Sequence, residues 1–162
     1  MGHLRRMKSG MKKGFSMVEL MIVVAILSIL AAIAVPNFQT MVLKARKAEA
    51  TPNLRGIGDA SVAYYAANSA WVTGASNPGS PIGKNLQAWK PTMAGWVDLG
   101  YRPDGMVRCT YVVKPFGSDS YARADAFCDV DDNNDSAIVR YYTSRVTTGA
   151  GGYFSYVNVD NY

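Results

Sequence analysis

The chain has 162 residues, 49% of them apolar, so it can bury one modest core and forms a single globular domain plus its terminal segments. Its formal charge of +5 comes from five bases before Gly14, because the other 12 Lys and Arg balance the 12 Asp and Glu. Those five are Arg5, Arg6, Lys8, Lys12 and Lys13. The body therefore lacks the excess of clustered cations that a phosphate-binding surface needs, which argues against nucleic-acid binding as its function.

The segment from Phe15 to Val35 is apolar over the length that a helix needs to cross a membrane. Only Ser16, Glu19 and Ser28 interrupt it. Its Leu, Ile and Val residues favour membrane insertion by more than one carboxylate near the helix start opposes it. More bases precede the segment than follow it, which favours the leader inside the cell and the body outside.

Two ordinary interpretations of this segment leave Glu19 unexplained. A plain signal anchor accounts for the apolar run and the basic leader, but it gives no reason for an acid in the first helical turn. A secretory signal peptide would use Ala32-Ile33-Ala34 as its cleavage site, so that the mature chain would begin at Val35. An acid inside the apolar region of a signal peptide is unfavourable, and this run is longer than such regions usually are.

The third interpretation rests on the run Lys12-Lys13-Gly14-Phe15-Ser-Met-Val-Glu19-Leu-Met-Ile-Val-Val-Ala-Ile-Leu. This run resembles the type IV prepilin signature, which joins basic residues, a glycine, an aromatic residue, a glutamate four positions later and an unbroken apolar helix. The resemblance continues to Phe38 and covers about the first quarter of the chain.

The resemblance implies a role for each residue of the motif. Residues 1–14 would be a leader that the prepilin peptidase removes by cutting between Gly14 and Phe15. Phe15 would then be the N-methylated N-terminus. Glu19, one helical turn later, would pair with the N-terminal amine of a neighbouring subunit and set the register of assembly.

The resemblance also implies the domain organisation. Residues 15–35 would be the transmembrane and assembly helix, and residues 36–162 the globular head, including the second half of the helix. We expect Pro36 to kink this helix. Apolar residues then recur at spacings of three and four, which predicts one long helix from Phe15 to about Ala67, with a kink or break at Thr51-Pro52.

The rest of the chain predicts strands. Gly, Ser, Asn and Pro between Thr73 and Gly83 indicate a loop, and Pro103-Asp104-Gly105 indicates a turn. The predicted fold is α+β, with the second half of the helix packed on a four-stranded antiparallel sheet, as in the type IV pilin fold. The four predicted strands are Val107–Val113, Tyr121–Cys128, Ser136–Thr143 and Tyr153–Val159.

Cys109 and Cys128 are the only two cysteines. In an exported domain such an isolated pair indicates one disulfide, whereas in a reducing compartment it would be two free thiols. Since the family often staples its head with such a bond, the resemblance favours the disulfide.

Two further patterns carry weaker hypotheses. Asp129, Asp131, Asn133 and Asp135 alternate as in a calcium loop, but the glycine and the bidentate glutamate of an EF-hand are missing, so a polar turn is preferred. Six C-terminal aromatic residues are interpreted as strand residues that cover a sheet, namely Tyr141, Tyr142, Tyr153, Phe154, Tyr156 and Tyr162. The single histidine is His3, and no catalytic constellation is present, so we expect neither enzymatic activity nor a cofactor.

The sequence therefore predicts a structural subunit of a type IV pilus, polymerised through its N-terminal helix into a filament for adhesion, motility or DNA uptake. Its expected partners are further copies of itself, the prepilin peptidase, the assembly platform of the inner membrane, and membrane lipid before assembly. Its location would be the inner membrane first and the extracellular filament afterwards. The alternatives are a pseudopilin of a type II secretion system and a singly anchored or secreted binding protein.

Overall fold

The computed structural model describes residues 14–79, 83–118, 120–133, 135–143 and 152–157. Of the predicted leader, only Gly14 falls within these ranges. The chain forms two compact units that divide between Phe38 and Gln39.

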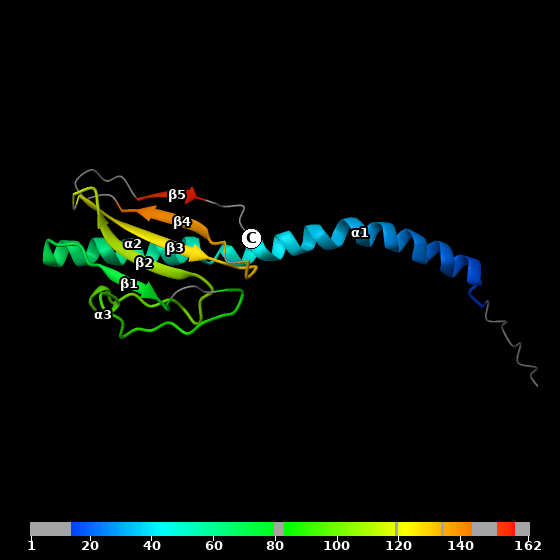
Figure 1. Ribbon diagram of the computed structural model, residues 1–162, viewed down its shortest axis with the longest axis horizontal. Coiled ribbons are helices and arrows are strands. Elements are labelled where there is room, and N and C mark those ends of the chain that lie inside the picture. The colour runs from blue at the N-terminus through cyan, green and yellow to red at the C-terminus, as the bar shows by residue number, and fades with distance from the viewer. Residues whose placement is uncertain (1–13, 80–82, 119, 134, 144–151, 158–162) are drawn as a thin grey trace, which may run out of the picture. The chain divides into compact units, whose positions relative to one another are not determined.

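The first unit is the apolar part of helix α1, which spans Met17–Lys47 (Figure 1). None of the residues of α1 is buried, and large apolar side chains are exposed from its start to Phe38. The helix continues through Pro36, whose ring removes the hydrogen bond to Ala32 O without ending the helix. A helix that is apolar on all sides is typical of a segment surrounded by lipid or by other helices.

The predicted interruption of the long helix is present, but it does not lie at Thr51-Pro52. Helix α1 ends at Lys47, and helix α2 spans Ala50–Asn68. Pro52 is thus the third residue of α2, within the first turn, where a backbone N–H has no acceptor inside the helix. The break therefore precedes the proline, because this placement spares α2 a lost hydrogen bond.

The second unit contains an antiparallel sheet of five strands in the order β1-β2-β3-β4-β5 (Figure 1). The prediction of four strands was one short. The strands are β1 Gly74–Asn77, β2 Thr110–Phe116, β3 Tyr121–Cys128, β4 Ala137–Tyr142 and β5 Tyr153–Val157. The residues predicted to extend the last strand beyond Val157 lie outside the described residues.

The extra strand, β1, comes from the segment that was predicted to be a loop. It pairs with β2 at the edge of the sheet, with a register irregularity between Gly74 and Asn77. Gly74 is required there, because a Cβ would lie 2.8 Å from Val113 Cγ1 and 3.0 Å from Trp96 Cε2. The small and polar residues that suggested a loop thus serve close packing at an edge strand.

Helix α2 covers one face of the sheet and forms the main core (Figure 1). Leu54 and Ile57 are fully buried, and each contributes roughly 1.5–3 kcal/mol through burial. The facing side of β3 presents small side chains, which let the helix approach closely. They are Ala122, Ala124 and Ala126, all buried. Gly58 lies against Tyr141, where a Cβ would overlap the ring.

The connection between β1 and β2 adds an aromatic layer to this core. It contains the short helix α3, Trp96–Leu99, bounded by Gly95 and Gly100, which have φ angles of 80° and 66°. Trp96 is buried, and its Nε1 donates a hydrogen bond to Ala75 O at 2.6 Å. Trp89 packs against Trp96 edge to face, with ring centroids 4.7 Å apart. The layer therefore fixes β1 to the body of the sheet.

Candidate assembly segment and its junction with the head

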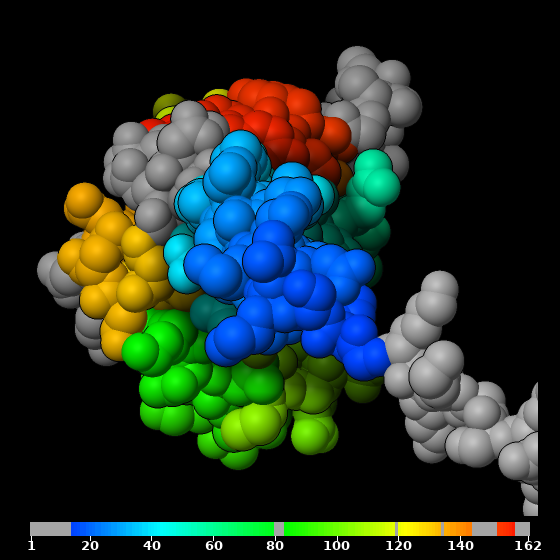
Figure 2. Space-filling view, turned by 90° about the vertical axis from the view of Figure 1, so that its right-hand side faces the viewer, coloured from blue at the N-terminus to red at the C-terminus, as the bar shows by residue number. Residues whose placement is uncertain are grey.

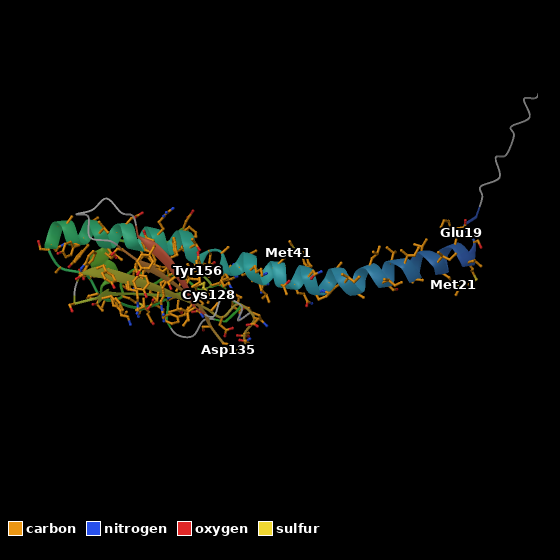
Figure 3. The ribbon with its side chains drawn as sticks, turned by 90° about the horizontal axis from the view of Figure 1, so that it is seen from above. Glu19, Met21, Met41, Cys128, Asp135 and Tyr156 are labelled. Atoms are coloured by element: carbon orange, nitrogen blue, oxygen red, sulfur yellow. A yellow bond between two sulfur atoms is a disulfide. The ribbon has the colours of Figure 1, made fainter. Side chains whose placement is uncertain are left out.

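Helix α1 begins with a capping box formed by Ser16 and Glu19. Ser16 Oγ accepts a hydrogen bond from Val18 N at 3.3 Å, and Glu19 Oε2 accepts one from Ser16 N at 2.9 Å. Figure 3 places Glu19 at this end of the helix. The box supplies hydrogen-bond acceptors to amide groups that a helix start leaves without partners. The neighbouring side chains are apolar and cannot supply such acceptors. The spacing Ser-x-x-Glu is readable in the sequence, but the sequence interpretation missed it.

Glu19 thus has a role inside its own helix, whatever its role between subunits. A carboxylate in the first turn also interacts favourably with the helix dipole. Both effects lower the free-energy cost of a charge that otherwise faces an apolar environment. The pairing of Glu19 with the amine of a neighbouring subunit stays a prediction, since a single chain does not test it.

Gly14 and Phe15 precede this box. A Cβ on Gly14 would meet no described atom within 4 Å, and its φ lies outside the left-handed region. Nothing in the described fold therefore requires a glycine at this position. Phe15 is also exposed, at 72% of its surface.

The surface of α1 up to Phe38 offers apolar side chains on every side, and Figure 2 shows these residues in blue at the surface. The hydroxyl of Ser28 donates to Val24 O at 2.7 Å, so this polar group is satisfied within the helix. Among the described residues, one helical stretch is long and apolar enough to cross a membrane, and it begins at Met17. By length and composition, this segment suits either lipid or a bundle of like helices.

The junction between α1 and α2 is fastened to both strands at one end of the β2–β3 pair. Glu49 Oε1 accepts hydrogen bonds from Arg108 N at 2.5 Å and from Cys109 N at 3.1 Å. Just after β3, Val130 O accepts a hydrogen bond from Arg46 Nη1 at 3.4 Å. These bonds hold the helix break in one position on the sheet.

The predicted disulfide between Cys109 and Cys128 is confirmed. Thr110 pairs with Phe127, so Cys109, just before β2, lies opposite Cys128, the last residue of β3, with their Cα atoms 4.4 Å apart. Both cysteines are fully buried in the core. The disulfide therefore closes the end of the strand pair to which Glu49 also binds.

A partly buried polar bridge links α2 to the sheet and the aromatic layer. Asn53 Nδ2 donates to Tyr111 Oη at 2.8 Å, and Tyr101 Oη donates to Asn53 Oδ1 at 3.1 Å. Burial raises the pKa of Tyr101 to about 12. Burial also raises the pKa of Tyr111, although the hydrogen bond from Asn53 opposes this shift. Both phenols are therefore held in their neutral forms.

The four candidate calcium ligands lie in the turn between β3 and β4, where Figure 3 labels Asp135. Their side chains bond within the turn: Asp129 Oδ1 accepts from Asp132 N, Asp131 Oδ2 from Asn133 Nδ2, and Asn133 Oδ1 from Asp135 N. Across the described ranges, no group of three or more His, Cys, Asp or Glu side chains could hold a metal ion. The calcium hypothesis stays untested by titration.

Five of the six C-terminal aromatic residues lie on β4 and β5, and Tyr162 is outside the described residues. Tyr141 and Phe154 pack together on the side of the sheet that faces α2, with centroids 4.7 Å apart. Tyr142 and Tyr153 stack at 4.9 Å, and alternation places them on the opposite side. These rings thus cover both faces of the sheet.

The fold and the N-terminal segment together define a class: an α+β protein with an apolar, acid-capped N-terminal helix. Residues 10–35 match the family described as a prokaryotic N-terminal methylation motif.

Curated relatives agree with this class. The type IV major pilin protein PilE1 of Neisseria gonorrhoeae is 39% identical over 83 residues, which are 48% of this chain and 39% of that protein. The type IV major pilin protein PilA of Myxococcus xanthus is 45% identical over 53 residues, or 33% of this chain and 24% of that protein. The fimbrial protein EcpC of Eikenella corrodens is 43% identical over 60 residues, or 37% and 39% respectively.

The chain spans less than half the length of each of these relatives. No solved structure matches it significantly. The methylation motif and the named relatives nevertheless agree with each other, and the N-terminal part of the chain is similar to type IV pilins.

Proposed function

We propose that this chain is synthesised as a prepilin, is cut between Gly14 and Phe15, and polymerises through the apolar part of α1 into an extracellular filament. The methylation motif supports the cut and the methylation of Phe15. The steric freedom around Gly14 supports the same step, because a glycine without a structural reason fits a protease that needs access to the backbone.

The observation that carries the proposal is the exposed apolar surface of α1 up to Phe38, which has an acid in its first turn. In the membrane this surface contacts lipid. In a filament the same surface contacts the equivalent helices of other subunits, so that no apolar area is returned to water. One surface thus serves both states.

Glu19 gives the assembled state its register. After the cut, the new amine of Phe15 lies four residues from Glu19, on the same face of the helix. In an apolar bundle a carboxylate needs a cationic partner, and the amine of a neighbouring subunit supplies one at a defined axial offset. On assembly, the Glu19 carboxylate forms this ion pair in place of part of its hydrogen bonding to Ser16 N.

The proposal implies a sequence of locations and partners. The chain is first a single-pass protein of the inner membrane, in contact with lipid, and is a substrate of the prepilin peptidase there. An assembly platform in that membrane then adds it to a filament of identical chains. The filament supports adhesion, motility or DNA uptake, and the chain itself has a structural rather than a catalytic role.

The relatives named as major pilins support a pilus subunit over a pseudopilin of a secretion system. A shearing experiment separates the two. Filaments sheared from intact cells and collected by centrifugation are labelled with an antibody against the head and viewed by electron microscopy. The proposal predicts labelled filaments in the sheared fraction; a chain confined to the membranes of piliated cells would contradict it.

A further inference from the structure

One face of the sheet lies away from α2. In Figure 1 the strands lie in front of α2, so this face is turned toward the viewer. The buried alanines of β3 belong to the core beneath α2. Alternation therefore places Arg123, Asp125 and Phe127 of the same strand on the opposite face, which we call the outer face.

Three cations meet on the outer face, where β2, β3 and β4 lie side by side. Arg123 and Arg140 share the carboxylate of Asp125, at 2.9 and 3.4 Å from their nearest nitrogens. Lys114 of β2 lies directly opposite Arg123 in the sheet register, and its side chain is exposed. Like charges at opposed positions of neighbouring strands are destabilising. An anion placed over Lys114, Arg123 and Arg140, the basic cluster, would relieve this repulsion.

The basic cluster is already held in a fixed arrangement. The guanidinium carbon of Arg123 lies 4.9 Å from the centre of the Phe116 ring, while one of its nitrogens contacts Asp125. Only 14% of the Arg123 side chain is exposed, and 29% of that of Arg140. Side chains held in this way lose little conformational freedom when a partner binds, which favours binding.

A row of apolar side chains crosses the outer face next to the basic cluster. Phe127 of β3 pairs with Ile138 of β4, and Ile138 pairs with Val157 of β5. All three side chains are half-buried. Contact with another apolar surface would remove their remaining exposed area from water.

An acidic group lies beyond this row, in the turn that follows β3. Its described members are Asp131, Asp132 and Asp135, of which the last two are exposed. Figure 3 shows Asp135 on the side of the sheet away from α2. Lys84 Nζ lies 3.9 Å from Asp132 Oδ2, but both side chains are more than half exposed, so this pair contributes little.

Bases, apolar row and acids thus follow one another along the strands. In the sequence, Phe127 lies four residues after Arg123 and four residues before Asp131. The apolar row is therefore midway between the two charged groups. A surface with this order is complementary to a copy of itself that runs in the opposite direction.

We propose that the outer face binds the outer face of a second copy of this chain, antiparallel and across a twofold axis near Phe127 and Ile138. The two apolar rows then meet at the centre, and the acids of each copy contact the basic cluster of the other. Such a contact is isologous, and its apolar centre and charged rim are the usual anatomy of a protein interface. A nucleic acid or an acidic glycan would match the bases but not the acids.

All these residues belong to the second unit, so the contact does not depend on assembly through the apolar part of α1. It joins two heads directly. Contacts between the named groups, rather than the total charge of the face, determine the pairing. A chain that failed to form filaments would still form this contact.

The test is sedimentation velocity of the full chain in a zwitterionic detergent, with micelles in excess so that each apolar helix is enclosed separately. We expect dimers that increase with protein concentration and that weaken as salt screens the exposed charges. A chain that stays monomeric through the concentration series would overturn the proposal. Particles that grow beyond the dimer would exclude the twofold arrangement.

Two charge reversals identify the surfaces. Lys114→Glu and Asp135→Lys each replace attraction by repulsion at both symmetric contacts of the dimer, so each variant alone should associate at least about tenfold more weakly than the wild type. In an equimolar mixture of the two variants, positions 114 and 135 again bring opposite charges together. Mixed dimers should therefore form with nearly wild-type affinity. Variants that dimerise normally alone, or that fail to associate when mixed, would refute the contact.

Arg55→Glu is the matched control. It makes the same change of charge on the exposed side of α2, behind the sheet, and should associate like the wild type. Equal weakening by Arg55→Glu would mean that total charge, not this face, governs association. Since Lys114 and Asp135 are both exposed, neither reversal should change the melting temperature, which separates lost contact from lost fold.

Discussion

At the scale of single residues, Glu19 combines two tasks that different substitutions can separate. It accepts a hydrogen bond from Ser16 N inside its own helix, and it carries the only charge in the apolar half of α1. Glutamine keeps the acceptor and removes the charge, whereas alanine removes both. Ser16→Ala removes the hydroxyl of the capping box but leaves the charge in place.

We predict that Glu19→Gln and Glu19→Ala both reduce the yield of sheared filaments strongly, because neither can pair with a neighbouring amine. Membrane insertion should be unchanged or improved, since a buried charge opposes insertion by up to about 3 kcal/mol. The measurement compares the chain in sheared and membrane fractions, with Ser16→Ala as the control of near-normal yield. If Glu19→Gln assembled like the wild type, capping alone would explain the residue.

Gly58 is the residue at which α2 approaches the sheet most closely. A glycine in a helix interior usually gains up to about 1 kcal/mol on replacement by alanine. Here the new Cβ would overlap the ring of Tyr141, and overpacking of this kind costs about 1–3 kcal/mol.

We therefore predict that Gly58→Ala lowers the free energy of unfolding by about 1–2 kcal/mol, as measured by urea denaturation. Asp59→Ala places the same residue on the exposed side of the same helix and should be close to neutral. A stabilised Gly58→Ala variant would mean that the helix and the sheet are farther apart than described.

At the scale of elements, the disulfide closes a loop between residues that are 19 positions apart, at the end of the β2–β3 pair. On the chain-entropy model, a loop of this size stabilises the fold by roughly 3 kcal/mol. Its neighbour Glu49 holds the helix junction to the same strand end. Loss of the disulfide should therefore loosen the junction as well as the sheet.

The prediction is that Cys109→Ala combined with Cys128→Ala lowers the free energy of unfolding by roughly 3 kcal/mol. Hydrogen exchange should quicken at Arg108 N, which is bonded to Glu49. Because α2 packs on the sheet through Leu54 and Ile57, its own amides should stay protected. Unchanged stability after removal of both cysteines would contradict this account.

The sequence predicted a strand correctly where its residue pattern was compatible with only one kind of element. The bounds predicted for β3 are those observed, because alternating small and larger residues between two turns indicate a half-buried strand. The strand predicted from Val107 to Val113 began too early, because Val107 is buried but forms only an isolated bridge with Gln87, and β2 begins at Thr110. Periodicity gives the face of a residue more reliably than it gives the hydrogen bonds.

The misses have physical reasons. Strand β1 is short and is rich in small and polar residues, and its pairing depends on Val113 and Trp96, which lie far away in the sequence. The pocket between the end of α2 and the β2–β3 turn also joins distant segments, so no local pattern indicates it. The capping box at Ser16 and Glu19 was also missed, although it is local and can be read from the sequence. The contacts between distant segments, by contrast, could not have been predicted from any local pattern.

At the scale of the whole molecule, stability should depend on alkaline pH through the partly buried Tyr101 and the fully buried Tyr111. An unfolded chain releases tyrosine protons near pH 10. Burial raises the pKa of Tyr101 to about 12 and raises that of Tyr111 as well. Their contribution to stability is therefore fully present below about pH 10 and is lost as the pH rises toward and beyond about 12, because the unfolded state ionises first.

We predict that the urea midpoint falls steadily over this alkaline range. Tyr101→Phe removes one of the two contributing groups and should make the fall shallower, at the loss of its hydrogen bond to Asn53. Tyrosine ionisation, followed by its ultraviolet absorbance in the folded chain, should show a late-titrating fraction. A midpoint independent of pH above about 10 would exclude these phenols as the source.

The division into two units assigns different tasks to different parts of the chain. The unit up to Phe38 has an apolar surface and a satisfied helix start, which suit lipid and helix bundles. The unit from Gln39 onwards has its own core, disulfide and sheet. Filament assembly and the stability of the head should therefore fail independently when each unit is altered.

The central claim, that this chain is a processed subunit of an extracellular filament, is tested most directly by the mass of its N-terminal peptide. The peptide is taken from filaments sheared off intact cells and sequenced by tandem mass spectrometry. We predict a peptide that begins at Phe15 and carries one methyl group on its amine. A peptide that begins at Val35, or an unprocessed chain that retains residues 1–14, would contradict the account.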